Sequence, residues 1–186
     1  MEIVYKAEPG AKVYRAAGRN LTNPVGEAIE LEPGEPAEKK KKVAVGTGTA
    51  AAPANAIHVW TDGGANPNPG PAGIGVVIVD GETMKELSEF LGHGTNQIAE
   101  LTAILRGLQE IADRNRPVVV YSDSAYSIGL LTQGWKAKAN VELVDKLRAL
   151  CRMFEDLRFV KVAGHAGIPL NERVDQLAGA AILRGR

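Results

Sequence analysis

The order of hydrophobic patterns after residue 56 constrains the fold of this chain more than any other feature. Three strands are predicted first, at residues 57–61, 73–80 and 84–91. Helices are then predicted at 96–114, 124–131, 141–154 and 170–183, with strands between them at 118–121 and 158–162. This order predicts an α/β fold with a mixed five-stranded sheet: a three-stranded antiparallel meander, then two parallel strands, with helices on both faces.

The first 56 residues have a different character. Short β-like runs at residues 2–6, 12–15 and 28–32 predict a small β-rich N-terminal unit over residues 1–35. Residues 36–56 combine a lysine run, Lys39 to Lys42, with Gly, Thr, Ala and Pro, a composition typical of a flexible linker. The main domain is expected over residues 57–186. A 35-residue unit is small for independent folding, so we expect it to dock on the main domain or on a second chain.

Composition excludes some classes of function. The chain has 22 Lys and Arg against 22 Asp and Glu, so any binding of a polyanion must be local. Its one cysteine, Cys151, cannot form an internal disulfide and lies in an apolar helical stripe, which predicts a buried thiol. No apolar run approaches the roughly 20 residues that span a bilayer, and no signal peptide is evident. We expect a cytoplasmic protein with no membrane partner.

Four acidic residues lie where predicted elements begin or end. Asp62 and Asp123 follow the first and fourth strands, and Glu100 and Asp175 lie in the first turns of two helices. Each aspartate that follows a strand has a simpler reading, as a turn former or a helix cap. If the two strands are parallel neighbours, however, the carboxylates meet where open α/β sheets bind ligands. Four such oxygen donors select Mg²⁺ or Mn²⁺, and two ions about 4 Å apart suit in-line phosphoryl displacement.

The frames around these residues resemble the ribonuclease H family, type 1, whose members cut the RNA strand of RNA/DNA hybrids. The matching frames are Trp60-Thr61-Asp62-Gly63-Gly64, Asn66-Pro67-Asn68-Pro69-Gly70, Thr95-Asn96-Gln97-Ile98-Ala99-Glu100, Tyr121-Ser122-Asp123-Ser124, Gly164-His165-Ala166-Gly167 and Asn171-Glu172-Arg173-Val174-Asp175. The resemblance covers residues 57–183 and implies a ribonuclease H-like fold.

The resemblance also implies an endonuclease with a two-metal-ion mechanism. Asp62 would bridge two Mg²⁺ ions, with Mn²⁺ as a substitute, and Asp123 and Asp175 would each complete one metal site. Glu100 would hold a metal and touch the 2′-hydroxyl beside the scissile phosphate. Water activated there would attack the phosphorus and leave a 5′-phosphate and a 3′-hydroxyl. His165 would transfer protons or help product leave, since imidazole titrates near neutral pH; the alternative is a surface loop histidine.

Substrate contacts follow from the same resemblance. Gly63 and Gly64 would let the nucleic-acid backbone approach closely, where main-chain groups can read 2′-hydroxyls. Thr95 and Asn96 are candidates both for a helix cap and for a phosphate contact. Asn171 is read either as a helix cap or as a substrate contact. The full set of implied substrate-binding residues is Gly63, Gly64, Asn68, Thr95, Asn96, Gln97, Trp135, Lys136, Lys138, Asn140 and Asn171.

One region departs from the family. Many bacterial members carry a basic, Trp-rich protrusion that grips the hybrid, and here it shrinks to residues 133–140. We hypothesise that Lys39 to Lys42 and the N-terminal unit supply a second contact to substrate. Two alternatives stand beside this: the lysine run is merely solvated, or the N-terminal unit dimerises an otherwise monomeric domain.

Two other functions compete with cleavage of RNA/DNA hybrids. The first is a nuclease of the same fold that prefers another duplex, either double-stranded RNA or a Holliday junction. The frames at Asn68, Asn96 and Gln97 match hybrid readers and argue against the junction. The second is a catalytically silent module that binds nucleic acid. The presence of all four carboxylates argues against it.

Overall fold

The computed structural model describes residues 2–3, 14–15, 44–47 and 52–185 of a chain that divides into two compact units, 1–40 and 41–186. In the first unit, β1 (Glu2–Ile3) pairs antiparallel with β2 (Tyr14–Arg15). The third strand expected there, at 28–32, lies outside the described residues, as does the lysine run at 39–42.

The second unit is built on a mixed six-stranded sheet in the order β3-β8-β7-β4-β5-β6. Its strands are β3 (Ala44–Thr47), β4 (Ile57–Ala65), β5 (Gly70–Asp80), β6 (Thr83–Gly94), β7 (Val118–Ser122) and β8 (Leu157–Lys161). Strands β4, β5 and β6 form the expected antiparallel meander, and β7 and β8 follow in parallel beside β4. The five strands predicted for the main domain are therefore confirmed, together with their pairing.

Strand β3 is a correction to the predicted linker. We assigned residues 36–56 to a flexible segment, but Ala44–Thr47 pair in parallel with residues 158–161 of β8. Without this partner β8 would be an edge strand with unpaired backbone groups. The short run Val43-Ala44-Val45 suits a strand, but its signal was weak within a stretch rich in Gly, Thr and Lys.

Four helices complete the second unit: α1 (Asn96–Gln109), α2 (Ala125–Thr132), α3 (Val141–Cys151) and α4 (Pro169–Arg184). All four were predicted, with ends that differ by up to five residues. The largest difference is at the end of α1, which we extended to residue 114. Ile111 lies beyond the helix yet is buried against the core. This loop residue extends the helical spacing of apolar residues in the sequence, which is why the helix was predicted too long.

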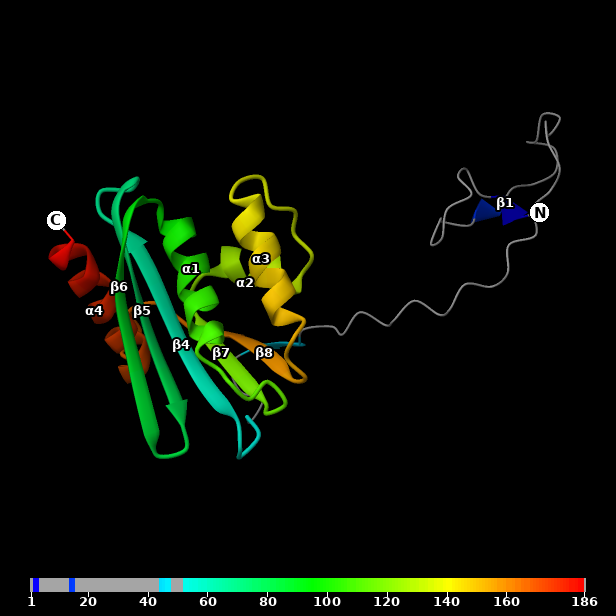
Figure 1. Cartoon of the computed structure of the whole chain (residues 1–186), viewed down its shortest axis with the longest axis horizontal. Helices are drawn as coiled ribbons and strands as arrows, with labels where there is room; N and C mark the ends of the chain where they lie inside the picture. Colours follow the sequence, from blue (N-terminus) through cyan, green and yellow to red (C-terminus); the bar gives the residue numbers. More distant parts are fainter. Residues whose placement is uncertain (1, 4–13, 16–43, 48–51, 186) are drawn as a thin grey trace. The chain divides into compact units, whose positions relative to one another are not determined.

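The helices cover both faces of the sheet, as Figure 1 shows, with α1, α2 and α3 on one face and α4 on the other. On the first face, Gly107 of α1 lies against Val59 and Thr61 of β4. On the second face, Gly75 of β5 lies against the backbone of α4 at Val174. Since Asp62 is the registered partner of Gly75, its side chain is on the α4 face of the sheet.

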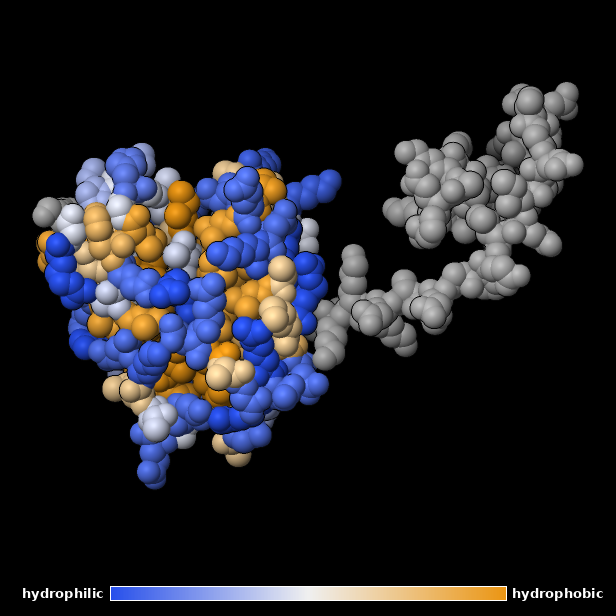
Figure 2. All heavy atoms as spheres, in the orientation of Figure 1, coloured by the Kyte–Doolittle hydropathy of each residue, from blue (hydrophilic) through white to orange (hydrophobic). Residues whose placement is uncertain are grey.

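The hydrophobic core lies between α1, α3 and the sheet, and its largest fully buried members include Leu101, Leu108, Leu147 and Phe159. Cys151 is buried in this core, which raises the pKa of its thiol to about 12 and confirms the predicted inert cysteine. Hydrophilic residues cover much of the face seen in Figure 2. None of the helices in the described part of the chain is long and apolar enough to cross a membrane.

Candidate active site

The pairing of β4 with β7 brings Asp62 and Asp123 together. The last registered pair of these parallel strands is Trp60 with Tyr121, whose rings stack at 4.1 Å between centroids. Each aspartate lies two residues further along, Asp62 within β4 and Asp123 directly after the end of β7, and their carboxylates interact. Asp62 is inside β4, which continues to Ala65, and not at its end as predicted. It nevertheless lies beyond the part of β4 that pairs with β7, so the predicted juxtaposition holds.

Glu100 approaches these aspartates from α1, where it is the fifth residue and so lies just beyond the predicted first turn. The helix starts at a capped end, because Thr95 Oγ1 accepts a hydrogen bond from the Ile98 N–H at 3.3 Å. The start of α1 lies directly against Gly63, where any side chain would overlap the backbone of Ala99 and Glu100. Gly63 therefore has a packing role: it lets Glu100 lie beside Asp62.

Two serines orient Glu100, and the sequence analysis missed them. Ser124 caps α2 by accepting from the Ser127 N–H at 3.1 Å, so Asp123 does not have the capping role that we considered for it. The Ser124 hydroxyl also donates to Glu100 Oε2, and the Ser127 hydroxyl lies 3.5 Å from the same oxygen. The signal was present in the sequence, because Ser124 directly follows Asp123.

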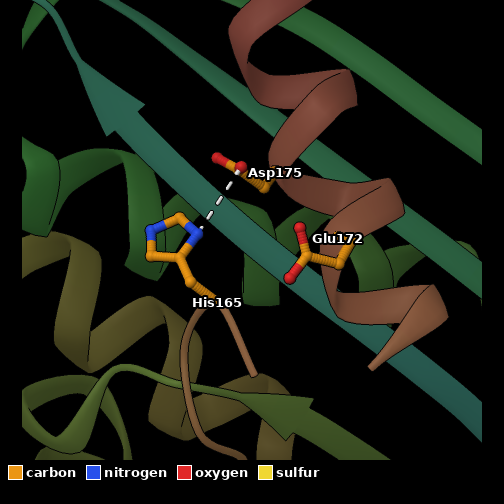
Figure 3. A group of neighbouring side chains, drawn as sticks. All are labelled: His165, Glu172 and Asp175. Carbon is orange, nitrogen blue, oxygen red and sulfur yellow. Dashed lines mark ion pairs between the residues drawn. The ribbon is translucent and has the colours of Figure 1, made fainter. Parts of the chain in front are cut away.

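Asp175 and His165 meet at the start of α4 (Figure 3). Asp175 is the seventh residue of the helix, in its second turn and not its first as predicted. His165 Nδ1 is 4.0 Å from Asp175 Oδ2, and the imidazole side chain is 81% exposed. The loop that carries His165 lies close to Asp123, because a methyl group on Gly164 would be 2.7 Å from Asp123 Oδ2. The loop thus joins the histidine to the carboxylate cluster.

Glu172, in the first turn of α4, is a further acidic residue beside this loop. Its Oε1 accepts a hydrogen bond from the Gly167 N–H at 3.3 Å, which ties the loop to α4. One ligand atom from each of His165, Glu172 and Asp175 lies within 4.8 Å of the others, a spacing that would suit a cation. Figure 3 shows the three side chains converging from the loop and from the first turns of the helix.

The pKa shifts in the cluster indicate that its carboxylates repel one another without a positive charge among the described residues nearby to offset the repulsion. Burial, and after it the nearby carboxylates of Asp123, Asp175 and Glu100, together raise the pKa of Asp62 to about 6 against a hydrogen bond from the Gly63 N–H. Burial also raises the pKa of Glu100, opposed by the hydrogen bond from Ser124. Four carboxylates interact here, and a divalent cation would relieve both their repulsion and their desolvation. The donor set is all oxygen, which fits Mg²⁺ or Mn²⁺.

Two predicted substrate-binding asparagines form a hydrogen-bonded bridge beside the cluster. Asn96 Oδ1 accepts from the Ala65 N–H at 2.8 Å, and Asn68 Oδ1 accepts from the Asn96 N–H at 3.2 Å. The bridge joins the end of β4, the following turn and the start of α1. Since both amide oxygens serve the protein, the Nδ2 donors are the atoms best suited to substrate, and minor-groove base edges present acceptors to such donors.

A shallow groove gathers four of the other predicted residues. It is lined by Gln97, Tyr126, Trp135, Lys136, Lys138 and Ala139. Tyr126 was missed by the sequence analysis, although it lies only three residues after Asp123. Asn140 lines an adjoining hollow with Ile98 and the start of α3, and has a left-handed backbone with φ of 56°. Trp135 is 47% exposed, so its indole is available to a ligand.

Gly64 and Asn171 differ in how well they suit contact with substrate. A methyl group on Gly64 would meet nothing within 4 Å, so this glycine borders open space. Asn171 is 6% exposed, which leaves little surface for a substrate. Its alternative reading as a helix cap is wrong, because α4 begins at Pro169 and Ile168 is in the cap position.

Comparisons with known proteins agree with this geometry. Residues 54–183 match the family model for RNase H. The chain is 37% identical over 117 residues to ribonuclease H of Chlorobium limicola, covering 55% of this chain and 78% of the relative, and 38% identical to that of Syntrophomonas wolfei, covering 57% and 82%.

Among solved structures, LC11-RNase H1 from compost is 33% identical with a TM-score of 0.60, over 70% of this chain and 98% of that one. The same protein has been solved in complex with an RNA/DNA hybrid, with 32% identity and a TM-score of 0.58 over 69% and 98% of the two chains. The predicted fold and resemblance are thereby confirmed. The chain belongs to the ribonuclease H family of enzymes.

Proposed function

We propose that this chain is an endonuclease that hydrolyses the RNA strand of RNA/DNA hybrids with the help of two divalent metal ions. The observation that carries the proposal is the convergence of Asp62, Glu100, Asp123 and Asp175, four interacting carboxylates in which the pKa of Asp62 is raised to about 6. Such a cluster is unfavourable without cations and suited to binding them.

The metal ions are the first part of the proposal. The ribonuclease H family is metal-dependent in general, and the oxygen-only donor set here favours Mg²⁺, with Mn²⁺ as a substitute. Asp62, which interacts with the other three carboxylates, would hold the ions together with them. When bound, the pair of ions would activate a water molecule and stabilise the leaving oxygen.

This chain's own residues would do the rest. Ser124 holds the Glu100 carboxylate in a fixed orientation, which suits contact with a 2′-hydroxyl next to the reacting phosphate. The exposed imidazole of His165, close to Asp175, would carry a proton between the leaving 3′-oxygen and solvent. In this scheme a P–O bond forms to water and the bond to the 3′-oxygen breaks, which gives a 5′-phosphate and a 3′-hydroxyl.

Recognition of the hybrid is supported by the neighbour solved with an RNA/DNA hybrid and by the placement of the predicted contacts. Asn68 and Asn96 lie at the start of α1, and the groove with Trp135, Lys136 and Lys138 is lined by Gln97, the next residue of this helix. One strand would be cut at the carboxylates while the groove holds the other through stacking and phosphate contacts.

A strand-labelled cleavage assay tests this function. The protein is incubated with Mg²⁺ or Mn²⁺ and with a hybrid, a double-stranded RNA and a double-stranded DNA, each with one strand labelled. We expect cleavage of the RNA strand of the hybrid alone, with Asp62→Asn inactive. An intact protein that leaves the hybrid uncut would refute the proposal, and preferred cleavage of double-stranded RNA would replace it with the competing nuclease.

The N-terminal unit enters the proposal as a second contact to substrate or as a dimerisation element. Deleting residues 1–40 removes this unit and keeps β3, which belongs to the sheet of the second unit. Hybrid affinity measured against salt concentration then separates the ideas. A weaker affinity with a shallower salt slope supports a substrate contact, whereas unchanged values with a loss of dimer mass in light scattering support dimerisation.

A further inference from the structure

The segment between α2 and α3, residues 133–140, folds back onto the helix that precedes it. After α2 ends at Thr132, Gly134 adopts a φ of 71°, which turns the chain, and the Trp135 N–H approaches the Gly129 carbonyl at 3.4 Å. The indole lies on Gly129, since a methyl group there would be 2.6 Å from the ring. Trp135 is therefore seated on α2 although almost half of its surface is exposed.

Arg148 of α3 holds this arrangement in place. Its Nη2 donates to the Leu130 carbonyl at 2.8 Å and to the Trp135 carbonyl at 2.7 Å, and its Nε donates to the Leu130 carbonyl at 3.2 Å. Asp145 is 3.8 Å away and largely exposed, so the ion pair contributes little. The carbonyls are the main partners of Arg148, and one guanidinium joins the last turn of α2 to the following segment.

The same segment lines the groove opposite Gln97 and Tyr126, with Trp135, Lys136 and Lys138. Only eight residues remain here, so few contacts are available to hold a nucleic acid. Affinity then depends on whether those few groups are ordered before binding, since ordering them on binding would cost conformational entropy. The Arg148 guanidinium orders the segment because it hydrogen-bonds to carbonyls at both ends of the turn. Lysine, with a single side-chain nitrogen, could not reproduce this geometry.

We propose that Arg148 is a positioning residue for substrate binding: it presets the segment 133–140 so that the groove is formed before the nucleic acid arrives. The inference rests on the proposed function, because the groove is assigned to the hybrid there. Arg148 itself acts through the two carbonyls, so its loss should weaken binding and leave the chemical step at the carboxylates intact.

The test compares Arg148→Gln and Arg148→Lys with Lys146→Gln, which removes the same charge from an exposed position of the same helix. Steady-state cleavage gives kcat and KM, and hybrid affinity is measured in an Asp62→Asn background. We expect both Arg148 variants to weaken affinity and raise KM by about tenfold, with kcat within twofold of the wild type and Lys146→Gln unchanged.

A second readout does not depend on the hybrid. Acrylamide quenching of tryptophan emission, with Trp135→Phe to subtract the signal of Trp60, reports how firmly Trp135 is seated. We expect stronger quenching of Trp135 in both Arg148 variants. Gly129→Ala perturbs the same seat independently, because it pushes the indole away without touching Arg148 and alanine favours the helix. Like the Arg148 variants, Gly129→Ala should raise both KM and the quenching of Trp135. If the Arg148 variants do not fold, Gly129→Ala alone tests whether the seating of Trp135 affects binding.

Two results would overturn the inference. One is hybrid affinity in the Arg148 and Gly129 variants equal to that of the wild type. The other is a weaker affinity with unchanged quenching of Trp135, which would assign Arg148 a direct electrostatic role. Failure of the proposed function looks different, because the wild type would then neither cut nor bind the hybrid, while quenching would still report whether Arg148 seats Trp135.

Discussion

The carboxylate cluster and the groove at residues 133–140 are built in opposite ways. The cluster is partly buried, and its members stand on β4, α1 and α4 or, for Asp123, directly after β7, so that the packing of these elements fixes their positions. The groove is open, and four of its six lining residues stand on an irregular segment held by contacts with one arginine and one glycine. The residues proposed for the chemistry are thus positioned by the regular elements, whereas those proposed for substrate binding are positioned by a few side-chain contacts. The two regions should respond differently to mutation.

Neutralising Asp62 is expected to produce the largest difference between the effects on cleavage and on hybrid binding. Asp62→Asn should reduce cleavage about a thousandfold or more, because the carboxylate that interacts with the other three is lost, yet leave hybrid binding in the groove nearly intact. In EDTA the variant should melt at a temperature equal to or above that of the wild type, since burial and neighbouring carboxylates disfavour the charged form.

Cleavage rates, hybrid affinity and thermal melting check this expectation. Glu155→Gln, at an exposed carboxylate outside the cluster, serves as the control. A clear loss of stability in the metal-free Asp62→Asn protein would contradict the picture of uncompensated negative charge.

Adjacent glycines offer the next test. Gly63→Ala forces a methyl group into the backbone of α1 and should cost about 1–3 kcal/mol of stability, with a loss of kcat as Glu100 moves. Gly64→Ala meets nothing within 4 Å and should leave stability unchanged while raising KM, if nucleic acid approaches there. Denaturant unfolding and steady-state kinetics distinguish the two. Equal effects on stability would mean that α1 does not depend on Gly63.

The third prediction concerns how the stabilisation of the fold by metal ions depends on pH. The pKa of Asp62 is raised to about 6, so its protonation stabilises the metal-free fold at low pH, and this contribution is lost as pH rises through about 6. Metal ions compete with that proton and should therefore raise the melting temperature more at pH 8 than at pH 5. Calorimetry with and without Mg²⁺ measures the difference. Asp62→Asn should flatten it, and an equal metal effect at both pH values would contradict the assignment.

The smallest effects are expected in the groove. Lys136→Gln and Lys138→Gln should each raise KM only a few-fold and reduce the salt dependence of hybrid affinity by about one phosphate contact, with kcat unchanged. Titrations over a range of salt concentrations measure the slope. A change in kcat without a change in slope would move these lysines from substrate binding to the chemistry.

Sequence reasoning predicted the sheet and the convergence of the four carboxylates, because both rest on strong local signals, whereas the roles of these carboxylates stay predictions. Alternating hydrophobic patterns defined five strands, and specific frames marked Asp62 and Asp123. It missed Ser124 and Tyr126 as neighbours of the site because their roles depend on contacts across helices. The assignment of Gly63 to substrate approach overlooked its packing against α1, which becomes visible only when the two elements are placed together.

The pairing of β3 with β8 also determines how the two borders of the sheet are protected. The border at β6 carries charged side chains such as Lys85, Glu86 and Glu89, which discourage another strand from adding there. At the opposite border β3 (Ala44–Thr47) pairs with β8 and is itself the edge strand, a run of only four residues that ends seven residues before the family match begins at residue 54. A version trimmed to that match would leave β8 open to pairing with a neighbouring molecule. The residues just before the family match thus decide whether the five-residue β8 or the shorter β3 presents its backbone at this border.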